Sequence, residues 1–166
     1  MPAGATYEPI ATSSPTSVGT VDFSSLGSYT DIRIVIFTRQ AAGSATDIRI
    51  RFNSDTGTNY SFTELYGTGA AAASASTSNA SYIAAGLTRN VANIWNATTV
   101  DIFNYAGATN KTVLTTDASE SNGSGYVWRK VGLWRSTSAI TTITVSLNSG
   151  NFATGTTISL YGIKAA

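Results

Sequence analysis

The side chains that could do chemistry in this chain are few, and nearly all are carboxylates. The 166 residues contain no His and no Cys, which excludes Ser/His/Asp and Cys/His nucleophilic sites and leaves zinc only carboxylate ligands. Asp101 and Glu64 could form a glycosidase pair if their strands were neighbours. Because strand carboxylates beside Arg and Lys more often form cross-strand ion pairs, we expect no catalytic site and no enzyme.

Two loops offer oxygen ligands for a calcium ion. The first contains Asn53, Asp55 and Asn59 at alternating positions, and the second spans residues 117–122. Neither matches a complete EF-hand loop, and hairpin turns favour the same residue types. We therefore expect no metal site and no cofactor, although the sequence leaves calcium binding by either loop open.

Charge excludes two classes of partner. Only 11% of the residues are charged, the net charge is +1, and the basic residues are dispersed from Arg33 to Lys164. No field of this size attracts nucleic acid or an anionic membrane surface, so we expect neither as a partner.

The elements that would position any site are strands. Apolar and polar residues alternate with period two in short runs rich in β-branched and aromatic residues, and Gly, Asn, Ser and Asp separate the runs. The expected strands are 6–11, 20–23, 31–39, 47–53, 60–67, 81–86, 99–105, 111–118, 126–135, 139–147 and 156–163. This pattern predicts one all-β domain over residues 1–166, an antiparallel, jelly-roll-like β-sandwich of about ten short strands.

The segments between these strands carry further expectations. Residues 53–59 and 106–110 contain turn formers and predict hairpins, which would make successive strands antiparallel neighbours. Residues 67–80 lack periodicity and predict a long surface loop, and residues 89–96 predict one helical turn. Residues 1–17 contain three prolines and predict either an extended N-terminal arm or a lead-in to the first strand.

Some strands are clearly amphipathic and others are not. Ile143, Val145 and Leu147 alternate with polar residues, and residues 47–52 do the same, so these strands face water on one side. Three other strands carry aromatic residues on the face that a one-sided strand would expose to solvent. Either loops such as 67–80 cover this second face, or it forms a subunit or partner interface. The candidate interface residues are Tyr60, Phe62, Tyr66, Phe103, Tyr105, Tyr126, Trp128 and Trp134.

Several segments resemble small virion proteins of tailed bacteriophages, including cyanophages. The segments are YEPIAT (7–12), FNSDTGTNYSFTELYG (52–67), VDIFNYAGATNKTVL (100–114), GLWRSTSAITTITV (132–145) and NFATGTTISLYGIKAA (151–166). The similarity covers nearly the whole chain, is closest in the C-terminal third and is weakest over residues 67–96. It implies an oligomeric, jelly-roll-like module on the capsid exterior or in tail appendages, and no motif within it carries a catalytic signature.

The resemblance leads to two expectations. In the first, the chain is a capsid decoration (cement) protein of the virion, a homotrimer that binds the major capsid protein and stabilises the shell. In the second, it is a tail-fibre or host-binding module that recognises cell-surface glycan through rings such as Trp128 and Trp134. The second expectation requires an exposed ring beside polar side chains.

Overall fold

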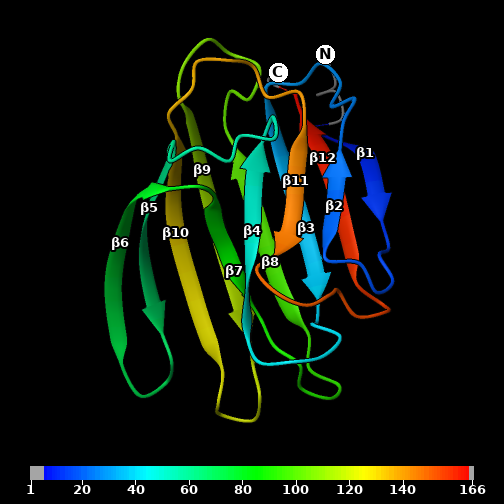
Figure 1. The fold of residues 1–166 in the computed structure, drawn as a ribbon, viewed down its shortest axis with the longest axis vertical. Coiled ribbons are helices and arrows are strands. Elements are labelled where there is room, and N and C mark those ends of the chain that lie inside the picture. Colours follow the sequence, from blue (N-terminus) through cyan, green and yellow to red (C-terminus); the bar gives the residue numbers. More distant parts are fainter. Residues whose placement is uncertain (1–5, 165–166) are drawn as a thin grey trace.

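The chain forms two stacked antiparallel sheets (Figure 1). A computed structural model describes residues 6–164 and contains no helix within them. The strands are β1 (Tyr7–Ser13), β2 (Thr20–Phe23), β3 (Asp31–Thr38), β4 (Thr46–Phe52), β5 (Tyr60–Gly67), β6 (Ala72–Ala80), β7 (Ile83–Thr88), β8 (Asn96–Ile102), β9 (Lys111–Ser119), β10 (Tyr126–Trp134), β11 (Ile143–Leu147) and β12 (Thr157–Ile163). The larger sheet has the order β1-β12-β3-β8-β9-β10-β5-β6, and the smaller has the order β2-β11-β4-β7. The expected all-β class is confirmed, and the arrangement is that of a β-sandwich.

Strand alternation creates the core between the sheets. In β3 the inward residues Ile32, Ile34 and Ile36 are fully buried, and in β4 the inward residues Ile48 and Ile50 are fully buried. Burying one such side chain stabilises the fold by about 1.5–3 kcal/mol. The expected inward sets of β4 and β11 are confirmed.

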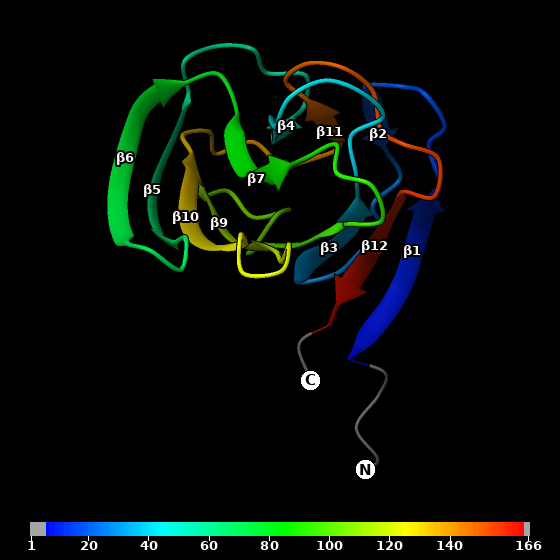
Figure 2. The ribbon, with the colours of Figure 1, turned by 90° about the horizontal axis from the view of Figure 1, so that it is seen from below.

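The larger sheet extends beyond the smaller one. Figure 2 shows it curling past β7, so that β10, β5 and β6 form an overhang at one side. Along one row of its inner face the residues change from Leu160, Ile34 and Val100 to Lys130 and Glu64. The inner face is therefore apolar beneath the smaller sheet and becomes charged and aromatic beneath the overhang.

Gly132 allows β7 to approach the larger sheet. A Cβ at this position would lie 3.0 Å from two carbon atoms of the Ile83 side chain, which is fully buried. Any larger side chain would push β7 away from β10, so glycine is required by packing here.

Three expectations about connections are wrong. Residues 67–80 are not a long loop, because the backbone pairs with β5 to form β6; small Ala and Ser side chains gave no periodicity to reveal a strand. Residues 89–96 form turns and the start of β8, without a helical turn. Residues 53–59 join strands of different sheets, whereas the expected hairpin at 106–110 does join the neighbours β8 and β9.

Most strand neighbours are distant in sequence, which also differs from the expectation of successive pairing. Only β5–β6, β8–β9 and β9–β10 are hairpin neighbours in the described part of the chain. Residues 7–13 of the expected arm form β1, which pairs with β12 of the same chain. Residues 1–5 lie outside the described residues.

Candidate protein interface

Four of the eight aromatic residues predicted at an interface are core residues. Tyr60, Tyr105, Tyr126 and Trp134 are at most 7% exposed, so the prediction that they lie on a contact surface is wrong for this chain. The reason is the parity of β5 and β10, whose aromatic side chains point toward the smaller sheet. The partner for these rings is the interior of their own domain.

Polar contacts explain how these large rings are accommodated. The hydroxyl of Tyr60 accepts a hydrogen bond from the Phe52 amide at 3.0 Å, and burial raises the pKa of Tyr60 to about 12. Trp134 Nε1 donates to a carboxylate oxygen of Asp55 at 2.7 Å. Asp55 also accepts from the Gly57 amide, so this carboxylate fastens the 53–59 connection to the core.

Phe62, Tyr66 and Trp128 are half-buried and lie on the inner side of the overhang. Lys130 Nζ pairs with Glu64 at 2.9 Å and lies 4.5 Å from the centroid of the Trp128 ring. Tyr66 meets Trp128 edge to face at 5.7 Å. These contacts are within the chain, and the covering predicted for this face comes from the curl of the sheet, not from a loop.

Phe103 is the exposed member of the predicted set, at the end of β8. Its side chain is 41% exposed, whereas Tyr105 two residues later is buried and donates its hydroxyl proton to the Gly27 carbonyl. The structure thus divides the predicted set into a core group, an overhang group and one exposed ring.

Exposed apolar side chains concentrate on the outer face of the larger sheet. Of the nine large hydrophobic residues that are exposed in the described chain, six lie in strands of this sheet and none lies in a strand of the smaller sheet. The six are Tyr7, Val35, Phe37, Leu65, Val127 and Val131. We call this surface the outer apolar face, and it is the strongest candidate for a functional site.

Strand register places three of these side chains around Arg129, which lies between Val127 and Val131 on the outer parity of β10 and opposite Leu65 of β5. Val131 lies opposite Thr63 of β5 and Leu114 of β9, and Val127 lies opposite Ala118 of β9. Leu65, Val127 and Val131 are 61%, 55% and 48% exposed, and they lie on adjacent strands. Monomeric proteins leave few large apolar surfaces uncovered, so three exposed apolar side chains on two adjacent strands favour a protein contact.

Few charges interrupt the outer apolar face. The Arg33 guanidinium contacts both carboxylate oxygens of Asp101, at 2.5 and 2.9 Å, and this pair lies between opposite residues of β3 and β8. Asp101 raises the pKa of Arg33 by hydrogen bonding. Arg129 donates to the hydroxyl of Thr116 at 2.7 Å. A partner that covered β3 and β8 would therefore meet a neutralised pair, and one that covered β10 would meet the Arg129 cation.

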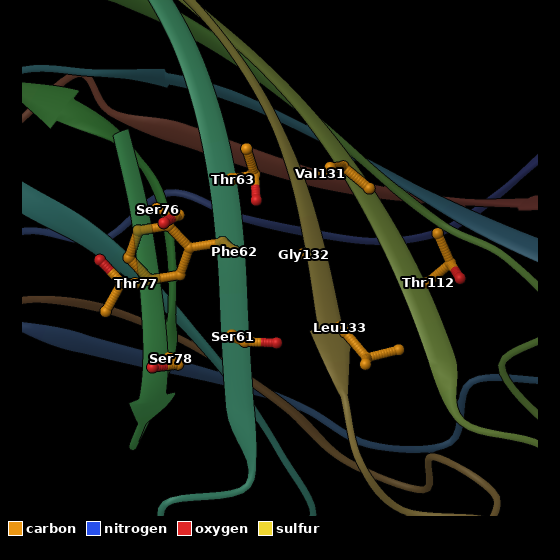
Figure 3. Close-up of a pocket in the computed structure, with 10 residues that line it drawn as sticks. All are labelled: Ser61, Phe62, Thr63, Ser76, Thr77, Ser78, Thr112, Val131, Gly132 and Leu133. Carbon is orange, nitrogen blue, oxygen red and sulfur yellow. The ribbon is translucent and has the colours of Figure 1, made fainter. Parts of the chain in front are cut away.

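A shallow groove of about 330 Å³ lies where β6, β5, β10 and β9 run side by side (Figure 3). Phe62, Val131, Leu133 and the Gly132 backbone provide its apolar part, and hydroxyl groups from the neighbouring strands surround them. The hydroxyl-bearing residues are Ser61, Thr63, Ser76, Thr77, Ser78 and Thr112. An apolar floor with neutral hydrogen-bonding groups suits a protein side chain better than an ion.

The outer face of the smaller sheet is polar. Arg49 and Arg51 of β4 lie 3.9 and 5.9 Å from the centroid of the Tyr82 ring, and Arg49 donates to its hydroxyl at 3.2 Å. Thr144 donates to Asp22 at 2.5 Å. These polar side chains contact one another on the surface of the smaller sheet.

The expected carboxylate pairs are ion pairs, as predicted. Asp101 contacts Arg33 on the outer side of the larger sheet, whereas Glu64 contacts Lys130 on its inner side. The two carboxylates therefore lie on opposite faces and cannot act on one glycosidic bond. The described residues contain no cluster of three acidic side chains that could hold a metal ion.

One buried carboxylate lies between the sheets. Asp117 accepts hydrogen bonds from the Thr98 hydroxyl at 2.5 Å and from the Leu87 amide at 2.9 Å. Burial raises the pKa of Asp117 to about 6, although these hydrogen bonds oppose the shift. Asn96 and Tyr126 donate to the Leu87 carbonyl, so side chains of the larger sheet satisfy the unpaired edge of β7.

A second groove, of about 520 Å³, lies among the loops at one end of the sandwich. It is lined by loop glycines together with Trp95, Tyr126 and Glu120. The Trp95 ring stacks on Phe37 at 4.9 Å and has the Arg39 guanidinium 5.5 Å from its centroid. These internal contacts leave Trp95 poorly placed to stack on a sugar. The two rings proposed for glycan binding, Trp128 and Trp134, lie in β10 and not in a polar loop.

Sequence reasoning missed the outer apolar face because β10 is apolar on both parities. Val127, Val131 and Leu133 alternate with larger aromatic residues, and the aromatic set appeared to be the surplus one. Side-chain type does not separate the two parities, because rings and β-branched side chains occur both in the core and among the exposed residues.

No helix in residues 6–164 is long and apolar enough to cross a membrane. Comparisons with protein-family models, with curated proteins and with solved structures find no match to this chain. Its function is therefore argued from its own residues.

Proposed function

We propose that this chain is a bacteriophage virion structural protein, a capsid decoration protein that binds the outer surface of the major capsid shell. The outer apolar face is the proposed contact surface. The observation that carries the proposal is the segregation of exposed apolar side chains, six in strands of the larger sheet and none in strands of the smaller one. The partner, the major capsid protein, is proposed from the resemblance of residues 52–67, 100–114, 132–145 and 151–166 to tailed-phage virion proteins.

The proposed mechanism is mass action. A protein that binds only the assembled shell stabilises that state by the free energy of binding at each site. Apolar contact supplies this energy, because each large side chain removed from water contributes about 1.5–3 kcal/mol. The contact requires no catalytic group, cofactor or metal.

Charge on the proposed contact surface is compatible with a protein partner. The Arg33–Asp101 pair is already neutralised, and Arg129 is the main unpaired charge near Val127 and Val131. Arginine beside exposed apolar side chains is compatible with a protein contact, because Arg is enriched at protein interfaces.

The alternative is a tail module that binds host glycan. The loop-end groove is the surface that favours it, because it combines Glu120 with the aromatic rings of Trp95 and Tyr126. Tyr126 is only 7% exposed and Trp95 already contacts Phe37 and Arg39, so neither ring offers the free face that sugar stacking needs.

Labelling of the protein in intact phage particles tests the proposal. We expect signal over the whole capsid, and we expect the purified protein to bind capsids that lack it. Signal confined to the tail, or no binding to such capsids, would contradict the decoration role. Tail signal together with retention on host-cell polysaccharide would support the alternative.

A further inference from the structure

Strand β6 leaves one edge of the larger sheet open. It is the last strand in the sheet order, and it pairs with β5 on one side and with no other described strand on its second side. Seven of its nine residues are exposed, and its side chains are those of Ala, Ser, Thr and Asn. A free strand edge is a ready template for another strand.

The other three edges have protection that β6 lacks. Edge strand β1 contains Pro9 and a register shift beside it, and β2 is four residues long and contains Asp22. Edge strand β7 has its Leu87 backbone groups bonded by side chains from the larger sheet. Residues 68–80 contain no charged residue and no proline, and the one irregularity of β6 lies near Asn79 at its end. This edge alone is long, neutral and regular.

The hairpin turn determines which backbone groups of β6 point outward. The Thr68 amide donates to the Ala71 carbonyl at 3.0 Å, which closes the β5–β6 turn. Bonded and non-bonded pairs alternate in an antiparallel ladder, so Ala73 and Ala75 bond to β5. Ser74 and Ser76 then present their N–H and C=O groups to the open edge.

The sequence of this edge is self-complementary. An antiparallel pairing of two copies about Ala75 puts Ser74 of each copy opposite Ser76 of the other, and Ala73 opposite Thr77. Ser74 and Ser76 have outward backbone groups, so they form the bonded pairs. Ala75 of one copy lies opposite Ala75 of the other in a non-hydrogen-bonded pair. The Cα atoms of such a pair are about 4.5 Å apart, and two methyl side chains fit at this distance.

We propose that a second copy of this chain pairs its β6 antiparallel with this β6, so that the larger sheet continues across a two-fold axis. A two-fold contact closes after two copies, whereas pairing of β6 with the protected β1 edge would not be self-complementary. This contact makes a dimer, whereas the family resemblance implies a trimer. It does not depend on the proposed function.

The affinity of the contact is limited by its area. Small side chains on one strand bury less than the roughly 800 Å² per partner of a standard interface, so we expect a dissociation constant of about 10–100 μM. Such a contact forms where copies are crowded, as on an assembled surface.

Charge substitutions at the paired positions test both the contact and its register. In sedimentation equilibrium up to about 500 μM, we expect wild type to dimerise and the S74K/S76K variant to bind itself at least about 10-fold more weakly, because like charges then lie opposite each other. The S74K/S76E variant places opposite charges together and should dimerise like wild type. Thr12→Lys on the exposed part of β1 is the matched control and should change nothing.

Several outcomes would overturn the contact. These are a wild-type monomer throughout the concentration range, a trimer, an S74K/S76K variant that dimerises like wild type, or an S74K/S76E variant as weak as S74K/S76K. Both serines are exposed, and a thermal melt checks that each variant folds. Capsid binding is measured separately on wild type at a concentration far below the dissociation constant of the dimer, so failure of the dimer and failure of the decoration role are distinguishable.

Discussion

The outer faces of the two sheets differ although their strands alternate in the same way. The smaller sheet presents Arg49, Arg51 and Asp22, which contact Tyr82 or Thr144, and the larger sheet presents Leu65, Val127 and other exposed hydrophobic residues. Where the two sheets face each other, the inner apolar residues of both are buried. This difference shows that alternation identifies the inward residues of a strand. The composition of the outward residues indicates whether solvent or a partner covers them.

Covering the outer apolar face would be favourable, because its apolar side chains are exposed to water in the isolated chain. Val127, Val131 and Leu65 are each about half exposed or more, so a partner that covered them would gain from their burial. The polar face offers no such gain, because the described strands of the smaller sheet expose no large hydrophobic residue. We therefore assign contact to one sheet and solvent exposure to the other.

The largest expected effect comes from placing charge on the outer apolar face. V127K/V131K should weaken binding to capsids about 1,000-fold, because two unpaired ammonium groups would have to be buried in the contact. Both positions are exposed, so the free energy of unfolding should change by no more than about 0.5 kcal/mol. Binding to capsids that lack the protein and a denaturant titration measure the two quantities.

Thr20→Lys on β2 is the control for this prediction, because Thr20 is exposed on the smaller sheet. It should leave both binding and stability unchanged. If T20K weakened binding as much as V127K/V131K, the assignment of the two faces would be reversed.

A smaller effect, on stability alone, should come from Asp117 between the sheets. Its pKa is raised by burial from 3.8 to about 6, so the folded state binds more protons than the unfolded state between these values. Stability should therefore fall as pH rises from about 4 to 6, by about 3 kcal/mol at about 1.4 kcal/mol per pKa unit. Denaturant titrations at several pH values measure the slope.

Asp117→Asn should remove this slope, since an amide can still accept from the Leu87 amide and donate to Thr98. Capsid binding by the variant should equal that of wild type at pH 7. A variant that kept the wild-type slope would show that another group titrates, and one that lost binding would show that the interior and the contact face are coupled.

The sequence predicted the strands better than it predicted their surroundings. β2 and β5 were predicted at their observed bounds, because β-branched runs between turn residues are a local signal. β6 was missed because Ala and Ser fit both strands and loops, and only pairing with β5 makes this segment a strand. The 53–59 connection was misread because turn residues do not show whether the next strand joins the same sheet.

The ion pairs of Asp101 and Glu64 were predictable from charge spacing, but their opposite faces were not. The aromatic set was assigned outward because one strand cannot show which of two apolar parities meets the core. Which parity meets the core depends on where the smaller sheet covers the larger one. That coverage depends on the widths of the two sheets, and the widths arise from pairings between strands far apart in sequence. Such pairings leave no local signal.

The most direct test of the contact assignment uses the absence of Cys, which makes any introduced cysteine unique. Val131→Cys and Thr20→Cys are labelled with a maleimide in the free protein and after binding to capsids. Exposed thiols react, so burial should slow labelling of the V131C variant at least about 10-fold on binding and leave T20C unchanged. Unchanged labelling of V131C in the bound state, with protection of T20C, would contradict the claim that the larger sheet makes the contact.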